Sequence, residues 1–288
     1  MERKGAMHLQ YGEVRQAHFL ERPNRFIAHV VLEGEAVVCH VKNTGRCREL
    51  LVPGATVYLE RGTNPARRTA WDLIAVEKGH RLINMDAQAP NRIFAQWIRQ
   101  QEPGIAVHPE YRYGDSRLDF CLERPEGLHL VEVKGVTLEQ EGHCLFPDAP
   151  TERGVRHLHE LIRAVEEGHR ATAFFVIQMA DVLDFAPNDA THPAFGEALR
   201  EAARRGVETE VTGHTGLEDG NKMRTVIQQK LDTLRALNEA LPGPQRSAAM
   251  TRMEKAGRSI VEAVEANPAK AKQVRRFANY YLPDAVNV

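Results

Sequence analysis

The chain has 288 residues, of which 42% are hydrophobic and 27% charged, and its 38 Lys and Arg against 39 Asp and Glu leave a net charge of −1. This composition is typical of a globular protein of about two domains, and it argues against a basic nucleic-acid coat protein or a polyacidic tail. The charge is unevenly distributed: residues 1–90 carry +3, residues 91–218 carry −9 and residues 219–288 carry +5. An acidic middle between basic ends favours a carboxylate-rich site whose flanks tolerate an anionic partner.

The first 90 residues predict a series of short strands. Apolar residues alternate over 26–32 and recur over 36–41, 57–59 and 73–76, with Gly, Pro and Asn between these runs. Several short strands with regular turns favour a small barrel or a sandwich. A five-stranded barrel of the OB type is one candidate, and nucleic-acid binding is a common function of that fold.

From Asn91 onward, helical and strand patterns alternate. The helix over 150–167 is predicted with Pro150 in its first turn and Gly168 at its end. In chain order the predicted elements are a helix over 91–101, strands over 107–113, 117–123 and 128–136, the helix over 150–167, a buried strand over 171–177, a helix over 193–205 and a strand over 207–212. This order predicts a mixed-sheet domain of the α/β (α+β) class.

The chain after Gly220 shows apolar residues at helical spacing throughout. Such stripes are typical of packing surfaces, so we expect a helical appendage that docks or mediates oligomerisation. The predicted organisation is therefore a barrel over 1–90, an α/β domain over 91–218 and a helical extension over 219–288.

No apolar signal core follows Met1, and no stretch reaches the roughly 18 apolar residues of a membrane-spanning helix. We therefore expect a cytoplasmic protein without a membrane partner. The four cysteines lie far apart and form no Cys-x-x-Cys pair, which favours buried free thiols in a reducing compartment over a zinc site. They are Cys39, Cys47, Cys121 and Cys144.

The strands over 117–123 and 128–136 carry the residues most indicative of chemistry. Asp119 lies on the first, whereas Glu132 and Lys134 lie two residues apart on the second and therefore share a face. Two carboxylates and a lysine in this order are typical of Mg²⁺-dependent nucleases. The carboxylates, with the Val133 carbonyl as a further oxygen, would hold Mg²⁺ or Mn²⁺, which would polarise a phosphate and activate water. Lys134 would orient that water or neutralise developing charge. The alternative is a surface ion pair on a half-exposed sheet.

Further polar residues could assist this site. Arg153, His157 and Glu160 recur on one face of the following helix, where phosphate and metal contacts would be suitable. Glu110, on the preceding strand, is a candidate third metal carboxylate, and Gln178 is a further polar candidate. For each of them, a solvated or structural role is the alternative.

Five ordered stretches of sequence carry a resemblance to a known family. They are Arg22–Phe26, His40–Gly45, Ser116–Phe120, Glu132–Leu138, and Phe146–Gly154 followed by His157 and Leu158. On these motifs, through about residues 12–213, the chain resembles the sugar fermentation stimulation protein family. The resemblance implies an OB-like barrel, a domain of the PD-(D/E)xK nuclease type and a bacterial or archaeal cytoplasmic location. It also implies DNA binding that is not sequence-specific and a regulatory role in sugar (maltose) utilisation.

By position, Asp119, Glu132 and Lys134 match the nuclease-like motif, and Arg153 and His157 match the helix after it. We therefore expect Asp119, Glu132, Lys134 and His157 to be catalytic, with Asp119, Glu132 and Glu110 as metal ligands. Two positions depart from the family pattern: Lys42 stands where Pro is usual, and Gly135 stands where Ser is frequent. The helical extension is atypical of the family.

Three functions follow from these patterns. In the first, a DNA-binding protein grips the phosphate backbone through basic and polar residues around one turn and on the later helix, although a solvated basic loop is the alternative. These residues are Arg22, Arg25, Asn43, Thr44, Arg46, Arg48 and Arg153. In the second, a metal-dependent nuclease cuts DNA or RNA. In the third, an interaction protein acts through the helical extension.

Overall fold

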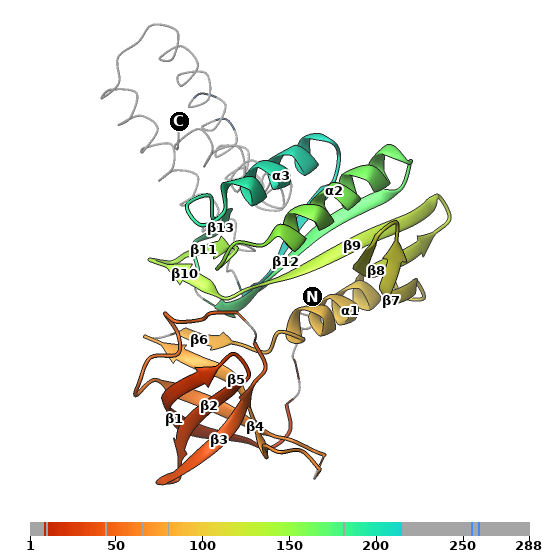
Figure 1. Ribbon diagram of the computed structural model, residues 1–288. Helices are drawn as coiled ribbons and strands as arrows, with labels where there is room; N and C mark the ends of the chain where they lie inside the picture. The colour runs from red at the N-terminus through yellow and green to blue at the C-terminus, as the bar shows by residue number, and fades with distance from the viewer. Residues whose placement is uncertain are drawn as a thin grey trace, which may run out of the picture. The chain divides into compact units, whose positions relative to one another are not determined.

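The computed structural model describes residues 9, 11–43, 45–64, 66–79, 81–180 and 182–214, together with residues 255 and 259 (Figure 1). The predicted helical extension thus lies outside the described residues, except for Lys255 and Ser259, which are helical. One compact unit takes in the described residues up to 138, 145–180 and 187–214, and a second includes 139–144 and 182–186. The domain boundaries at residues 90 and 218 stay a prediction. Within the described ranges, no helix is long and apolar enough to cross a membrane.

The N-terminal half of the main unit is a closed five-stranded barrel of OB type (Figure 1). β1 pairs with β2 and β4, β2 pairs with β3, and β4 pairs with β5, all antiparallel. A short parallel pairing of β3 with β5, at His40–Asp72 and Val41–Leu73, closes the ring. β6 extends the sheet from β5. The strands are β1 (Val14–Asn24), β2 (Ile27–Leu32), β3 (Glu35–Val41), β4 (Thr56–Arg61), β5 (Trp71–Lys78) and β6 (Arg81–Asn84).

Alternation of side chains along these strands builds the barrel core. Ala28 and Val30 of β2 are fully buried, while Ile27, His29 and Val31 between them remain partly exposed. The turn from β2 to β3 places Glu33 and Gly34 at φ +53° and +88°, the conformation that tight hairpins need and glycine adopts freely. The predicted OB-like barrel is confirmed.

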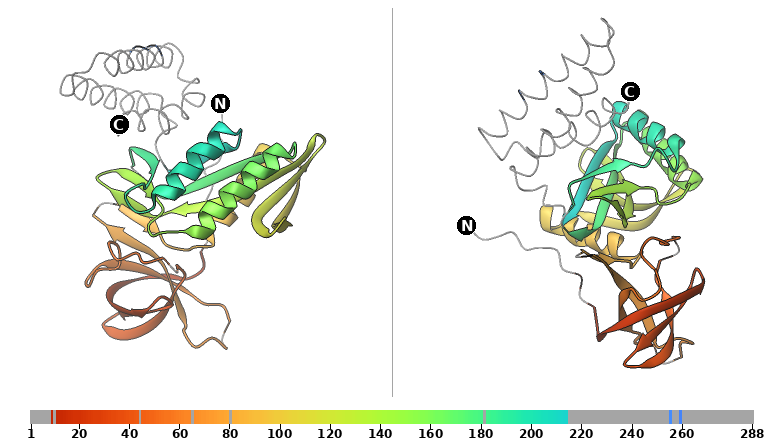
Figure 2. Two further views of the ribbon diagram at one scale, coloured as in Figure 1. Left: turned by 45° about the horizontal axis from the view of Figure 1, so that its top comes forward. Right: turned by 90° about the vertical axis from the view of Figure 1, so that its left-hand side faces the viewer.

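The α/β domain is built on a five-stranded mixed sheet in the order β14-β12-β9-β8-β7. β12 runs parallel to β9 and β14, whereas β8 is antiparallel to β7 and β9. Helices α2 and α3 lie side by side along the sheet (Figure 2). The elements are α1 (Ala89–Gln101), β7 (Ala106–Tyr113), β8 (Ser116–Arg124), β9 (Gly127–Val136), α2 (Glu152–Glu166), β12 (Arg170–Ala180), α3 (Pro193–Arg204) and β14 (Glu208–His214). The predicted α/β class is therefore confirmed.

Helix α1 covers the face of the sheet opposite to α2. Phe94 and Ile98 of α1 pack against Val131 and Val133 of β9 in one buried cluster. Because side chains alternate along a strand, Glu132 and Lys134 must point to the other face. His157 of α2 contacts Glu132 on that face, so the pattern predicted for β9 holds.

The start of α2 differs from the prediction. Thr151 is the N-cap, and its hydroxyl accepts a hydrogen bond of 3.1 Å from the Gly154 N–H. Pro150 therefore precedes the helix instead of lying in its first turn. A side-chain cap satisfies one of the free N–H groups that the first turn leaves, and this stabilises a start at Glu152.

The smaller unit contains most of a three-stranded sheet in the order β10-β11-β13. Its strands are β10 (Leu138–Gln140), β11 (His143–Phe146) and β13 (Asp184–Pro187). These strands, like β1 and β6, were not predicted from the sequence. The four cysteines are free and buried, as expected.

Candidate functional site

Asp119 lies where strands β8 and β9 separate. Their paired register ends at Phe120 and Val131. Just beyond that point the Asp119 carboxylate accepts the Val133 N–H at 2.8 Å through Oδ2. Its other oxygen, Oδ1, accepts a hydrogen bond of 3.0 Å from the Asn91 side-chain amide in the first turn of α1. Because the β8–β9 ladder ends here, the Asp119 carboxylate can accept the N–H of Val133, the residue that follows Glu132 on β9.

Glu132 is 4% exposed and receives two hydrogen bonds on one carboxylate oxygen. Lys134 Nζ and His157 Nδ1 both donate to Oε1. Arg153 Nε donates to His157 Nε2 at 3.3 Å, which leaves the proton of a neutral imidazole on Nδ1, facing Glu132. The other oxygen, Glu132 Oε2, is buried and has no hydrogen-bond partner among the described residues.

The two carboxylates differ in their affinity for protons. Burial, followed by the nearby charge of Glu132, raises the pKa of Asp119 above its ordinary value. Burial also acts to raise the pKa of Glu132, but the hydrogen bond from His157 and the charge of Lys134 outweigh it and leave that pKa lowered. The two pKa values are thus shifted in opposite directions: burial favours the protonated form of Asp119, whereas the bonds from His157 and Lys134 favour the ionised form of Glu132.

The arrangement fits a hard divalent cation. A buried carboxylate oxygen without a partner is costly unless something positive satisfies it. Mg²⁺ commonly uses only one or two protein carboxylates and keeps water or substrate oxygens as its other ligands. This agrees with the described residues, which hold no group of three or more His, Cys, Asp or Glu able to bind a metal by themselves.

The predicted third carboxylate lies apart from this pair. Glu110 occupies a left-handed position of β7 at φ +53°, and its side chain is 63% exposed. Arg117 Nη1 donates to its Oε2 at 3.4 Å. Its role as a metal ligand stays a prediction that no contact supports.

Gln178 and Gly135 form a tight packing contact close to Lys134. A Cβ atom on Gly135 would lie 2.3 Å from Gln178 Oε1 and 2.7 Å from Pro90 Cγ, so this position requires glycine as the neighbours now stand. Gln178 Nε2 also donates to the carbonyls of Asn84 and Asp86 at 3.0 and 3.2 Å. Gln178 therefore has the structural role that was the alternative for it.

Arg22 fixes the shape of the predicted DNA-binding loop. Its guanidinium donates to the carbonyl oxygens of Gly45, Arg46, Arg25 and Asn43 at 2.7–2.9 Å. Those bonds use both terminal nitrogens of the guanidinium, so Arg22 is placed to organise the loop, and its contact with phosphate stays a prediction. Asn43 also has a structural contact, because its Oδ1 accepts the Gly45 N–H at 2.8 Å. Thr44 lies outside the described residues.

Three other predicted arginines remain available at the surface. Arg25, Arg46 and Arg48, which we call the basic corner, are exposed, and their side chains form no ion pair with any described residue. Lys42 does not add to their charge, because its Nζ lies 3.2 Å from Asp86 and 3.5 Å from Glu60. Arg153 is exposed on α2, where it contacts His157.

The basic corner lies beside the segment that leads into α2. A Cβ atom on Gly45 would come within 2.9 Å of Asp148 Oδ2, and the charge of Asp148 adds to burial in raising the pKa of Cys47 to about 12. Asp148 precedes Arg153 by five residues. The loop on the barrel and the helix that carries His157 are thus neighbours within the main unit.

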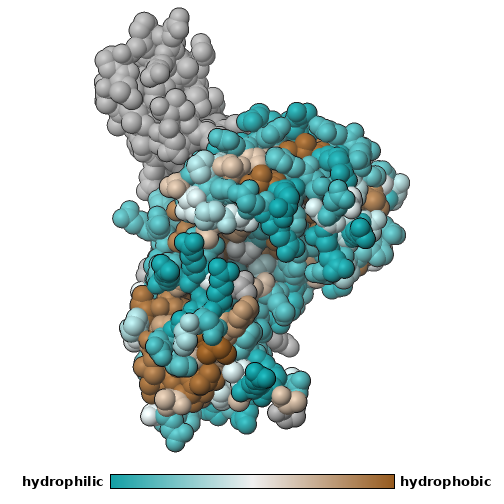
Figure 3. Space-filling model, in the orientation of Figure 1, coloured by the Kyte–Doolittle hydropathy of each residue, from teal (hydrophilic) through white to brown (hydrophobic). Residues whose placement is uncertain are grey.

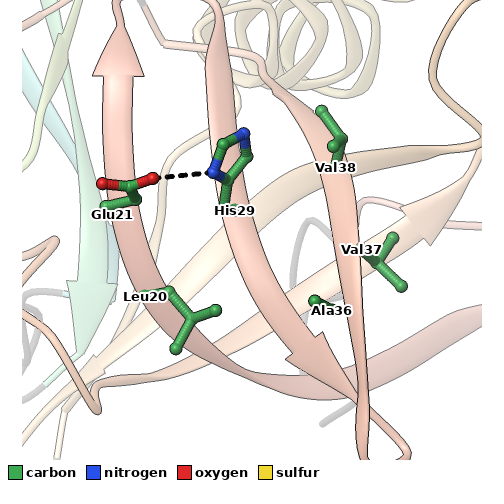
Figure 4. A pocket seen from close by; sticks show the side chains of 6 residues that line it. All are labelled: Leu20, Glu21, His29, Ala36, Val37 and Val38. Atoms are coloured by element: carbon green, nitrogen blue, oxygen red, sulfur yellow. Dashed lines mark hydrogen bonds and ion pairs between the residues drawn. The ribbon is translucent and has the colours of Figure 1, made fainter.

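A separate hollow of about 450 Å³ lies on the outer surface of the barrel (Figure 4). Its lining is mostly apolar and comes from β1, β2 and β3, with one polar pair in which His29 lies 2.8 Å from Glu21. Apolar side chains gather over the barrel in Figure 3, and Leu20 and Val38 are 41% and 49% exposed there. No predicted site residue lines this hollow, and no Lys or Arg is among its lining residues.

Two features of the site could not be found from sequence patterns. Asn91 was predicted only as the start of a helix, because nothing in its neighbourhood marks an amide that holds Asp119. The clamp formed by Arg22 joins residues up to 24 positions apart through backbone carbonyls. Carbonyl acceptors are present at every residue, so they leave no signature in a sequence.

The fold and the site define a class: a closed OB barrel followed by a mixed-sheet domain with helices that brings Asp119, Glu132 and Lys134 together. The family models agree. Residues 20–85 match the model described as SfsA N-terminal OB domain, and residues 88–215 match that of the Sugar fermentation stimulation protein RE domain. The chain belongs to the sugar fermentation stimulation protein family.

Individual relatives give the same result. Proteins named sugar fermentation stimulation protein homolog, from Desulfitobacterium hafniense and Ruminiclostridium cellulolyticum, are 52% and 51% identical over 202 residues, which is 69% of this chain and 89% of each relative. The solved structure of Pyrococcus furiosus SfsA in complex with Ca²⁺ is 29% identical, with a TM-score of 0.66 over 72% of this chain and 92% of that one.

Proposed function

We propose that this protein is a divalent-cation-dependent phosphodiesterase that acts on DNA or RNA, with Asp119 and Glu132 as the metal ligands. The observation that carries the proposal is the buried, unpartnered Glu132 Oε2 beside a second carboxylate whose pKa is raised. The solved relative is a complex with Ca²⁺, which supports the binding of a divalent cation in this family. Mg²⁺ or Mn²⁺ is the expected ion for phosphoryl chemistry.

Each residue of the cluster would have a separate role. A bound cation would supply Lewis-acid chemistry, polarising the phosphate and lowering the pKa of a water that attacks phosphorus as one P–O ester bond breaks. Lys134 can donate to a phosphate oxygen as negative charge develops. His157 holds Glu132 through Nδ1, and Arg153 orients His157. In this proposal His157 and Arg153 position the carboxylate, while the catalytic role of His157 and the DNA contact of Arg153 stay predictions.

The test is cleavage of labelled single- and double-stranded DNA and RNA with Mg²⁺ or Mn²⁺. We expect products that disappear with a chelator and that Glu132→Gln does not form, since the amide loses the charge that holds the cation. Glu123→Gln is the matched control, because Glu123 is an exposed carboxylate of the neighbouring strand β8. Equal products from wild type and Glu132→Gln would eliminate the nuclease proposal.

A second proposed function, supported by the basic corner, is DNA binding without sequence readout. Exposed guanidinium groups beside the segment that leads into α2 would neutralise backbone phosphates and release their counterions. Such contacts hold a strand in place without reading its bases. The predicted role in regulating sugar (maltose) utilisation and oligomerisation through the extension both stay predictions.

Salt dependence tests this binding. The logarithm of the association constant should fall linearly with the logarithm of salt concentration, and Arg46→Ala should make that slope shallower by about 0.9. Arg15→Ala is the control, because Arg15 on the same barrel is already paired with Glu13 at 3.0 Å. A slope that is flat, or that is the same in both variants, would remove the basic corner from the interface.

A further inference from the structure

Phe26 is the single exposed aromatic side chain among the described residues, with 55% of its surface exposed. Burying a phenylalanine normally stabilises a fold by about 1.5–3 kcal/mol. This ring lies at the tip of the β1–β2 hairpin, where little of it is buried, so it gains little of that stabilisation. Its position therefore calls for a reason outside the packing of the barrel.

The backbone beneath the ring is held firmly. Asn24 Oδ1 accepts the N–H groups of Phe26 and Ile27 at 2.9 and 3.1 Å, which closes an Asx turn. The Phe26 carbonyl accepts the Val41 N–H at 2.8 Å. The exposed ring is thus mounted on an ordered turn, so little backbone freedom would be lost when a ligand bound it.

The same tip is joined to the basic corner. A single guanidinium, that of Arg22, bonds the carbonyl of Arg25 and also the carbonyl of Arg46. The residue before Phe26 and the loop that carries Arg46 and Arg48 are therefore held within reach of one side chain. The result is an aromatic face accompanied by three exposed cationic groups.

We propose that Phe26 stacks on an unpaired base, so that the basic corner binds single-stranded DNA or RNA in preference to duplex. This inference rests on the nucleic-acid binding proposed above and adds the substrate class. Sites of this kind combine cationic groups that follow the backbone with aromatic rings on which bases stack. In a duplex, both faces of each internal base are covered by its neighbours, so the ring has no partner there. The loop between the first two strands is also one of the surfaces by which OB folds bind oligonucleotides.

The experiment compares four probes in a chelator, which prevents cleavage, and the three single strands carry equal charge. The probes are an oligothymidine strand of about twelve nucleotides, the corresponding oligouridine, a strand of equal length with abasic sites, and a duplex. Phe26→Ala should weaken binding of the thymidine and uridine strands about tenfold and leave duplex binding unchanged. Phe26→Trp should retain wild-type affinity, and its added indole should be quenched when a strand binds. The DNA and RNA arms show which backbone is preferred.

The abasic strand isolates stacking from charge. Wild type should bind it about as weakly as Phe26→Ala binds the thymidine strand, and the alanine variant should not distinguish the two strands. Leu82→Ala is the matched control, because Leu82 is an exposed apolar residue of β6 on the same barrel, at 53%. It should bind every probe like wild type.

Several outcomes would overturn the inference. One is wild-type affinity of Phe26→Ala for the thymidine strand, and another is an equal loss on single strands and duplex. A third is failure of Phe26→Trp to retain binding, which would indicate a structural role. If wild type cleaves nucleic acid with Mg²⁺ while Phe26→Ala binds normally, stacking is refuted and the phosphodiesterase proposal stands. If wild type binds no probe at low salt, the proposed nucleic-acid binding fails together with the inference.

Discussion

Replacing Asp119 with asparagine should lower metal-dependent cleavage about a thousandfold and should also make the metal-free protein more stable. Cleavage should fall because a cation that acts as a Lewis acid lowers the activation barrier by several kcal/mol, and each 1.36 kcal/mol is tenfold in rate. The metal-free variant should be more stable because burial and the charge of Glu132 raise the pKa of Asp119 in the folded state. Ionising that carboxyl at neutral pH therefore works against folding.

The sign of the pH dependence follows from that direction. A carboxyl whose pKa is raised by folding favours the folded state below its unfolded pKa of about 3.9, and this advantage is lost as pH rises through the folded pKa. The difference in free energy of unfolding between Asp119→Asn and wild type should therefore widen as pH rises above 4 and then level off. The asparagine oxygen can still accept the Val133 N–H, but its amide group cannot accept from Asn91, so the Asn91 amide has to turn and present its oxygen instead.

Urea unfolding in a chelator, from pH 4 to 8, measures this difference, and repeating it with Mn²⁺ provides the second half of the test. The cation should stabilise wild type in proportion to its occupancy and should have little effect on the variant. Asp115→Asn, an exposed carboxyl in the β7–β8 turn, is the control. A metal-free Asp119→Asn that is less stable than wild type at pH 7 would contradict the assigned electrostatics.

Replacing Asp86 with asparagine should reduce the free energy of unfolding by about 3 kcal/mol, the range for breaking one partner of a buried ion pair. Asp86 is fully buried, and its Oδ2 lies 3.2 Å from Lys42 Nζ and contacts Arg92 of α1. Burial raises the pKa of Tyr11 to about 12, so its hydroxyl stays protonated and donates to the same oxygen at 3.4 Å. An amide would leave the two cations without their shared counter-ion.

Urea unfolding at pH 7 measures this loss against Glu13→Gln, which removes an exposed pair with Arg15 and should have little effect on the free energy of unfolding. Adding Lys42→Met to Asp86→Asn should recover part of the stability, because it removes a largely buried charge that is then left with Glu60 alone, at 3.5 Å. Equal costs for Asp86→Asn and Glu13→Gln would show that the Asp86 cluster does not hold the barrel to α1.

Much of the fold can be predicted where one face of an element is apolar. The strands around Ala28 and Val131 alternate clearly, and the positions of Glu132 and Lys134 on one face follow from that alternation alone. β1 was missed because only Ala17 and Phe19 of its eleven residues are buried, so the strand is polar in composition. β6, β10, β11 and β13 have at most four residues each, too few to show a period.

The sequence predicts which residues form the candidate site better than it predicts how they are arranged. Two carboxylates and a lysine on neighbouring strands are chemically distinctive. This allowed Asp119, Glu132 and Lys134 to be grouped, together with His157. What the sequence does not contain is the break in the β8–β9 ladder, which turns Asp119 toward the Val133 N–H. Arg22 was predicted as a phosphate contact because charge is visible in a sequence, whereas its bonds to four carbonyls depend on where separate loops meet.

The clamp made by Arg22 also affects how readily this surface can change. Its acceptors are main-chain oxygens, which every amino acid possesses, so the outline of the corner does not depend on which side chains stand at positions 25, 46 and 48. Relatives, or a protein engineer, could therefore exchange those side chains for acidic, aromatic or neutral ones and retain the same scaffold. Selectivity for the bound strand can vary there independently of the architecture that presents it.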